Sequence, residues 1–417
     1  MSDINLLKRY RMDEPKSREK YESIYHSEFA HIIGIPLRQM NASHSYPAFY
    51  YYTETMVQIL SDIMMELRDL SILADRLPGV AIHSFQRTCL IEEIQSSNEI
   101  EGVRSTRKEI QNAMDESQNN GIRLWSMVHK YQKLQQKEEI PFRTSRDLRV
   151  FYDEFLADEI RRSDETNLPD GKLFRKETVE IWNGTRIIHR GILPEEKIIS
   201  YMDTALAILQ NEHIPGLIRV SIFHYLFGYI HPFYDGNGRT SRFITSYYIA
   251  KFLNPFVAIR LSITIRKSLR VYYKLFEDTN HQGNYGDLSP FITGFLWLIQ
   301  KSIHRVHDIL QEKGKKLFSL EKAVKASPDI PSQKERKIYD ILLQAYLFSD
   351  EGATVEEIAH TLGQSTRTIR THLTRYPADH IEVDPSHKAH RYKLSEHFVQ
   401  KLEQLALRQR NASHGSL

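Results

Sequence analysis

The chain of 417 residues carries 56 basic and 53 acidic side chains, a formal net charge of +3, and 41% hydrophobic residues. This composition provides apolar material for two or three domains, and its near-balanced charge argues neither for nor against a nucleic-acid partner. The single cysteine, Cys89, excludes an internal disulfide, and no uninterrupted apolar run is long enough to cross a bilayer. We therefore expect a cytoplasmic protein without membrane contact.

Residues 1–45 are polar and rich in charge, and we expect an N-terminal extension that is ordered by packing on the rest of the chain. The next region, residues 46–140, is expected to be helical. Its first element is predicted as an amphipathic helix between Tyr46 and Leu77, in which the aromatic cluster fits core packing better than a ligand site.

A second helix of this region is predicted to end at Gly102, a natural helix stop. Its apolar stripe consists of Phe85, Leu90, Ile91 and Ile94. Glu99 and Glu101 stand at the end of this helix, where the helix dipole slightly disfavours acidic groups. They are either solvated charges or carboxylates that have a partner elsewhere in the chain.

The segment from Glu180 to Pro194 contains an Asn-Gly pair among β-branched residues, and this pattern predicts a β-hairpin. A plain surface hairpin would satisfy the pattern equally well.

A buried helix, a glycine-rich turn and a second helix follow in order. The apolar run from Leu217 to Ile230 predicts a buried helix that places His231 at its C-terminal end. Arg239 to Leu253 reads as the second helix, closed by Asn254-Pro255. Between the helices, Gly236-Asn237-Gly238 can adopt positive φ and point successive N–H groups at an anion. The sequence therefore predicts a phosphate site at this turn.

The side chains around the turn suit a nucleotide triphosphate. Arg239 and Arg242 are three residues apart, so both can reach a polyphosphate from one face of a helix. Asp235 is a hard oxygen ligand for Mg²⁺ bound to the same phosphates. His231, with an ordinary pKa of about 6.5, can accept a proton from an attacking hydroxyl at neutral pH. Each feature alone has an ordinary structural explanation, but their ordered combination favours catalysis.

The segment His231-Pro-Phe-Tyr-Asp-Gly-Asn-Gly-Arg-Thr-Ser-Arg242 resembles the signature of the Fic family, His-x-Phe-x-Asp/Glu-Gly-Asn-Gly-Arg-x-x-Arg, at every specified position. The resemblance covers about half of the chain. It implies an all-helical core that transfers AMP from ATP to a protein hydroxyl and releases pyrophosphate. It also implies that His231 is the general base and Asp235 the Mg²⁺ ligand. The implied ATP-binding residues are Gly236, Asn237, Gly238, Arg239, Thr240, Ser241 and Arg242, with the two arginines on the outer phosphates.

A shorter segment, Ser97-x-x-x-Glu101-Gly102, is similar to the inhibitory motif that accompanies many Fic domains. In that family the glutamate pairs with the second motif arginine, here Arg242, and obstructs the γ-phosphate of ATP. The resemblance therefore implies that Glu101 is an autoinhibitory residue.

Two further segments correspond to family features. The hairpin corresponds to a flap that pairs with an extended target segment, which makes Ile187, Ile188 and His189 candidate substrate contacts. Tyr272 or Tyr273 is a candidate for stacking on adenine, although a packing role is an equally good explanation.

Residues 312–333 are charged and interrupted by prolines, and we expect a linker. Residues 334–398 have the apolar spacing of a helix-turn-helix followed by two strand-like segments, so they resemble a winged-helix domain. Residues 399–417 are expected to form a C-terminal helix or tail. The recognition helix carries three arginines that suit DNA, although such modules also serve protein contacts, and both alternatives stay open. These arginines are Arg367, Arg370 and Arg375.

The expected protein is mainly α, with a Fic-type helical core at residues 141–311, a β-hairpin flap and a C-terminal winged helix-turn-helix. We predict an adenylyltransferase that uses ATP and Mg²⁺, modifies a Tyr, Thr or Ser hydroxyl of a protein, including its own chain as a candidate target, and is autoinhibited by Glu101. Alternatives are removal of AMP by the same site and a DNA-binding regulator whose Fic core senses nucleotide. A homodimer is a further open expectation.

Overall fold

The computed structural model describes residues 5–38, 42, 44–119, 121–183, 186–330, 332–385 and 389–414. The chain divides into two compact units, of which the first comprises Met1–Leu67 with Glu93–Ile303 and the second Arg68–Glu92 with His304–Leu417. Segments that are distant in the sequence combine in each unit, and the expected domain boundaries at residues 141 and 312 stay a prediction.

The first unit is built mainly from helices, with two small antiparallel hairpins. Its helices and strands, some of which extend into the second unit, are α1 (Leu6–Met12), α2 (Glu14–Tyr25), β1 (His31–Leu37), β2 (Tyr46–Tyr50), α3 (Glu54–Asp75), α4 (Gly79–Ile100), α5 (Arg107–Asp115), α6 (Trp125–Gln135), α7 (Ser145–Tyr152), a π-helical turn (Asp153–Ala157), α8 (Asp158–Asp164), β3 (Glu180–Asn183), β4 (Arg186–Arg190), α9 (Glu195–Gln210), α10 (Gly216–Ile230), α11 (Asn237–Phe252), α12 (Pro255–Ala258), α13 (Leu261–Lys267), α14 (Leu269–Thr279) and α15 (Ser289–Ala326).

The predicted helix from Tyr46 to Leu77 is wrong in its first part. Tyr46–Tyr50 forms β2 and pairs with β1, and the helix begins only at Glu54. The aromatic side chains suit a strand because one of them, Phe49, is completely buried in a cluster with Tyr21 and Tyr285. This cluster attaches the N-terminal extension to the rest of the unit.

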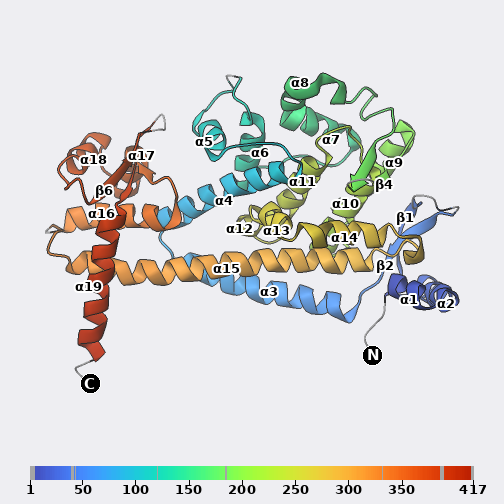
Figure 1. Cartoon of the computed structure of the whole chain (residues 1–417), viewed down its shortest axis with the longest axis horizontal. Coiled ribbons are helices and arrows are strands. Elements are labelled where there is room, and N and C mark those ends of the chain that lie inside the picture. The colour runs from blue at the N-terminus through green and yellow to red at the C-terminus, as the bar shows by residue number, and fades with distance from the viewer. Residues whose placement is uncertain are drawn as a thin grey trace. The chain divides into compact units, whose positions relative to one another are not determined.

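The centre of the first unit is the pair α10 and α11, which lie side by side (Figure 1). Nearly every residue of α10 is buried, as its apolar sequence predicts, because other elements of the unit cover it on all sides. The loop between the two helices, residues 231–236, is therefore held at both ends by buried helices. The predicted hairpin is also confirmed: β3 and β4 pair antiparallel, with Ile181 opposite His189.

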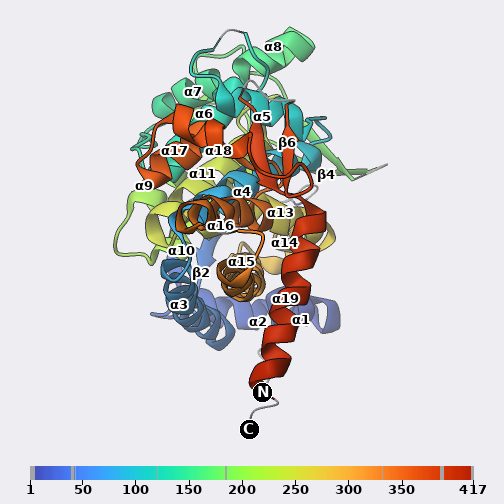
Figure 2. The ribbon, with the colours of Figure 1, turned by 90° about the vertical axis from the view of Figure 1, so that its left-hand side faces the viewer.

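In the second unit, α15 continues to Ala326, so most of the expected linker at residues 312–333 is helical. The following elements are α16 (Gln333–Phe348), β5 (Ala353–Thr354), α17 (Val355–Leu362), α18 (Thr366–Leu373), β6 (Ile381–Asp384), β7 (Arg391–Leu394) and α19 (Glu396–His414). Figure 2 shows α17 and α18 near β6, and the sheet has the strand order β5-β7-β6. This order of elements is the one expected, while the assignment as a winged-helix domain stays a prediction.

No helix in the described part of the chain combines the length and the apolar character needed to cross a membrane.

Candidate active site

His231 lies directly after α10 and adopts a left-handed backbone conformation, with φ of 54°. This conformation is uncommon for a residue other than glycine, and it turns the chain sharply away from the helix axis. The Nδ1 atom of His231 lies 3.4 Å from the carbonyl oxygen of Gly228. Burial of the ring, followed by the nearby His189 and Arg175, lowers the pKa of His231 to about 3, so its imidazole is neutral at pH 7.

The glycine-rich turn has the geometry of an anion site. Gly236 has φ of 79° and directly precedes α11, whose first N–H groups have no partner within the helix. The side chain of Asn237 closes the turn, because its Oδ1 accepts from the Phe233 N–H at 3.0 Å and its Nδ2 donates to the Phe233 carbonyl at 2.7 Å. The side chain of Asn237 therefore stabilises the loop, and the backbone N–H groups at the start of α11 are the candidate anion-binding groups.

Arg242, the second motif arginine, is held by the end of α4. Its Nη1 donates to Glu101 Oε1 at 2.7 Å, its Nη2 to the Ser97 carbonyl at 2.8 Å, and its Nε to Ser97 Oγ at 3.1 Å. The helix ends here, where Gly102 takes up φ of 71°. Two residues of the predicted inhibitory motif, Ser97 and Glu101, thus contact Arg242 directly, while their inhibitory role stays a prediction.

Gly238 makes this arrangement possible. A Cβ atom at this position would lie 2.0 Å from Glu101 Oε1 and 2.8 Å from Arg242 Nη1. Any larger residue must therefore displace the carboxylate, the guanidinium or both.

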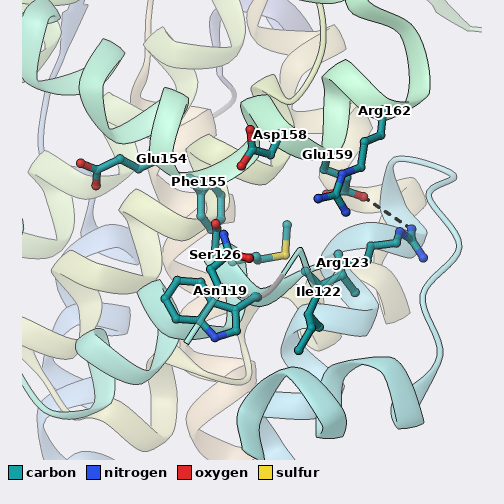
Figure 3. Close-up of a pocket in the computed structure, with 12 residues that line it drawn as sticks. Asn119, Ile122, Arg123, Ser126, Glu154, Phe155, Asp158, Glu159 and Arg162 are labelled. Carbon is teal, nitrogen blue, oxygen red and sulfur yellow. Dashed lines mark hydrogen bonds and ion pairs between the residues drawn. The ribbon is translucent and has the colours of Figure 1, made fainter. Parts of the chain in front are cut away.

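Arg239, the first motif arginine, contacts Glu159 and Asp235. Its Nη1 donates to Glu159 Oε2 at 3.0 Å and its Nη2 to Asp235 Oδ2 at 3.5 Å, and its side chain is buried. Glu159 also accepts from Arg123, and Figure 3 shows these two side chains facing each other beside a small pocket. The two motif arginines therefore contact different carboxylates in this structure, and their joint binding of the outer phosphates stays a prediction.

Asp235 fits the role of a Mg²⁺ ligand. Its side chain is partly exposed, with one oxygen near Arg239 and the other accepting from the N–H of Gly236. No group of three or more metal-binding side chains occurs among the described residues. A cation here would take one carboxylate together with phosphate oxygens, which is a usual way of binding Mg²⁺.

A cavity of about 190 Å³ is lined by part of this set, whereas Asp235, Gly236 and Arg239 are not among its lining residues. From the predicted set, it is lined by His231, Asn237, Gly238, Ser241, Arg242, Glu101, Tyr272, Tyr273 and His189. Thr240, which was expected to bind ATP, is completely buried and does not line the cavity. Of the two candidate adenine contacts, Tyr273 is 47% exposed, whereas Tyr272 is buried with its hydroxyl 2.8 Å from His224 Nε2.

The flap turns one predicted substrate contact inward. His189 Nε2 lies 2.6 Å from the carbonyl oxygen of Tyr229, and the side chain is buried against α10. Ile187 is partly exposed on β4, and the side chain of Ile188 lies outside the described part of the chain. His189 therefore contacts the backbone of α10 two residues before His231, and Ile187 is the described candidate for target contact.

Several residues of the site were not predicted. His224 lies on α10, seven residues before His231, and lines the same cavity. Its Nδ1 lies near Thr245 and Ser241, and burial lowers its pKa to about 3. Glu159 carries no local sequence signal, because it meets Arg239 only in the folded chain.

The three predicted DNA-contact residues are in the second unit. Arg367, Arg370 and Arg375 are all exposed on or directly after α18, and Arg370 forms an ion pair with Glu356. Exposed arginines at this position suit contact with DNA and contact with another protein equally well.

The chain is similar to known proteins in sequence and in fold. The model of the Fic/DOC family matches residues 144–249. The protein adenylyltransferase Fic of Nematostella vectensis is 38% identical over 72 residues, which are 17% of this chain and 15% of that protein. A Fic family protein from Desulfovibrio desulfuricans G20 aligns over 83% of this chain and 98% of its own, with a TM-score of 0.50 and 20% identity. Fic-1 from C. elegans aligns over 61% and 75%, with a TM-score of 0.40 and 18% identity. The family match includes the whole segment from His231 to Arg242, so residues 144–249 are identified as a Fic/DOC family region, and the chain shares its fold with the Desulfovibrio protein.

Proposed function

We propose that this chain is a protein adenylyltransferase that transfers AMP from ATP to a protein hydroxyl, releases pyrophosphate and is held inactive by Glu101. The observation that carries the proposal is the position of Arg242, which lines the same cavity as His231 while Glu101 and Ser97 occupy its guanidinium. The name of the Nematostella relative supports the same chemistry.

In the proposed reaction, the hydroxyl oxygen of the target attacks the α-phosphorus of ATP. The bond from that phosphorus to the oxygen that bridges to the β-phosphate breaks, pyrophosphate leaves, and the hydroxyl proton passes to His231. With Nδ1 of His231 directed at the Gly228 carbonyl, Nε2 is the nitrogen left to accept this proton. Bound triphosphate would raise the pKa of the imidazole from its low value, because nearby negative charge favours the protonated form.

The phosphates would be held by the backbone N–H groups at the start of α11 and by Arg242. Asp235 is the residue that would hold Mg²⁺, whose chemistry is to neutralise charge on the leaving pyrophosphate. Arg239 would act through its contact with Asp235, by fixing the position of that carboxylate.

Autoinhibition in this proposal is competition for one guanidinium. Glu101 places a negative charge at the group that the outer phosphate would need, and it lies within ordinary ion-pair distance. Because Arg242 is almost fully buried, its guanidinium needs a negatively charged partner, so Glu101 competes directly with a bound phosphate for that position. Glu101 is nevertheless partly exposed, which allows the lock to open.

A second candidate is removal of AMP from a modified protein. One observation favours it: Glu101 lines the cavity together with His231, so its carboxylate is available to orient a water molecule for attack. The same set of variants separates the two reactions.

The test uses the wild type, Glu101→Gly, and Glu101→Gly combined with His231→Ala. Each receives Mg²⁺ and ATP labelled at either the α- or the γ-phosphate, with the chain itself and a cell lysate as protein substrates. We expect α-label and the mass of AMP on protein only with Glu101→Gly, and loss of both with His231→Ala. Transfer of the γ-label would contradict adenylylation, and release of AMP from labelled protein by the wild type, but not by Glu101→Gly, would favour removal.

A further inference from the structure

Arg175, in the loop before β3, is an arginine with unusual surroundings. Its side chain is among the largest that are fully buried, at 0% exposure. Among the described residues it forms no ion pair, and its three guanidinium nitrogens donate to main-chain carbonyl groups instead. A buried cation with no carboxylate partner is costly, so its retention calls for a function.

The carbonyl groups that Arg175 binds come from two parts of the site. Nε donates to the carbonyl of His231 at 2.8 Å, and Nη2 to that of Ile230 at 3.3 Å. Nη1 donates to the carbonyl of Glu177 at 2.6 Å, and Nη2 also to that of Ile192 at 3.0 Å. The guanidinium of Arg175 therefore connects the end of α10 with the segment before β3, at Glu177, and the segment after β4, at Ile192.

The backbone around Arg175 is built for this contact. Its own N–H donates to the carbonyl of Pro232 at 3.2 Å, and the N–H of Ile192 donates to that of Ile230 at 3.1 Å. A Cβ atom on Gly191 would lie 2.2 Å from Arg175 Nη2 and 3.3 Å from His231 Cβ. Glycine at position 191 thus allows the flap, the guanidinium and the histidine to meet.

We propose that Arg175 is a positioning residue, which fixes His231 in its left-handed conformation and fixes the flap relative to it. This inference rests on the proposed function for His231 as the base. Arginine suits the task because its fork presents several donors in fixed directions, whereas lysine cannot reach four carbonyls in this way. Its charge also faces the C-terminal end of α10, where the helix dipole is negative.

The charge of Arg175 has a second effect on the base. After burial and His189, it is the next cause that lowers the pKa of His231. The other charged or titratable groups that share the cavity are His224, Arg242, Glu101, Glu277 and the two tyrosines of α14. Removal of Arg175 should therefore raise the pKa of His231 while leaving these groups in place.

The test compares Arg175→Met and Arg175→Lys with Arg190→Met, all in the Glu101→Gly background. Arg190 is a matched control, because it lies on β4 but is exposed and pairs with Glu180. We expect Arg175→Met to lower kcat about 100-fold, as small displacements of reacting groups do, with less than about a threefold change in KM for ATP. Arg175→Lys should keep the pH profile but recover little of kcat. An unchanged kcat in a folded Arg175→Met variant would overturn the proposal.

Two measurements keep the test independent of enzyme activity. Hydrogen exchange of residues 177–192 and 228–236 should become faster in Arg175→Met and stay unchanged in Arg190→Met. The NMR titration of His231 should shift to higher pH in Arg175→Met. If Arg175→Met fails to fold, Gly191→Ala, which displaces the guanidinium and keeps its charge, should accelerate the same exchange. If neither exchange nor titration changes, the proposal is wrong even where the parent variant is active; if they change while the parent is inactive, only the proposed function fails.

Discussion

Arg242 and Glu101 form an ion pair whose two members are unequally exposed: the side chain of Arg242 is 1% exposed and that of Glu101 is 31% exposed. The carboxylate can therefore return to water when the pair breaks, whereas the guanidinium cannot. If the pair acts as the proposed lock, we expect it to open by movement of Glu101 at the end of α4, with Arg242 kept in place to receive an anionic ligand.

Glu101→Gln should increase the affinity for ATP with Mg²⁺ about tenfold, because a neutral amide competes less well for the guanidinium and does not repel phosphate. Calorimetry with a non-hydrolysable ATP analogue would measure this change. Glu99→Gln is the control, since Glu99 lies at the same helix end but pairs with the exposed Arg266. An equal gain in both variants would point to general charge repulsion and not to the Arg242 pair.

Gly238→Ala should destabilise the wild type by about 1–3 kcal/mol, because the added methyl group overlaps Glu101 and Arg242. In the Glu101→Gly background the cost should be smaller by about 1 kcal/mol or more, since the nearest overlapping group is gone. Urea unfolding of the four proteins in this cycle gives the coupling energy. Additive effects would mean that Glu101 is not held against Gly238 in solution.

Glu159→Gln should lower the free energy of unfolding by about 1–3 kcal/mol, because Arg239 is buried and loses a charged acceptor. Glu154→Gln is the matched control, as Glu154 is an exposed glutamate that pairs with Lys130 nearby. Chemical denaturation would compare the two, and a similar small loss in both would show that the Arg239 pair contributes no more than a surface ion pair.

The part of the site that could be predicted is the part encoded by neighbouring residues. His231, Asp235 and the glycines lie within one loop, and the apolar run of α10 fixes where that loop begins. The pairing of Glu101 with Arg242 was accessible only through a resemblance, since 141 positions separate the two residues.

Where the structure differs from the sequence-based predictions, the cause is a contact with a residue that is distant in the sequence. The spacing predicts that Arg239 and Arg242 share one face of α11, but Arg239 donates to Glu159, which lies 80 positions away in the sequence. Tyr46–Tyr50 is a strand because β1 lies beside it, which helical periodicity does not reveal. Arg175 has no pattern around it, and its function depends on carbonyl groups at the end of α10 that only the fold brings near.

Glu93 lies on α4, four residues before Ser97 and therefore on the same face of the helix. Glu93 is fully buried, and its two carboxylate oxygens accept from the N–H of Ser262 at 2.9 and 2.8 Å. Burial outweighs these hydrogen bonds and raises the pKa of Glu93 from 4.5 to about 7.

The folded state therefore keeps a proton that the unfolded state loses, so stability should fall as the pH rises from 4.5 to about 7 and then level off. The contribution is on the order of 1–3 kcal/mol. Glu93→Gln removes this titration, so the free energy of unfolding of the variant should increase relative to that of the wild type as the pH rises. Glu92→Gln changes a partly exposed neighbour, and its stability should follow that of the wild type at each pH. Urea unfolding between pH 5 and 8 measures the difference, and parallel curves for the wild type and Glu93→Gln would show that Glu93 is already ionised in the folded protein at pH 5.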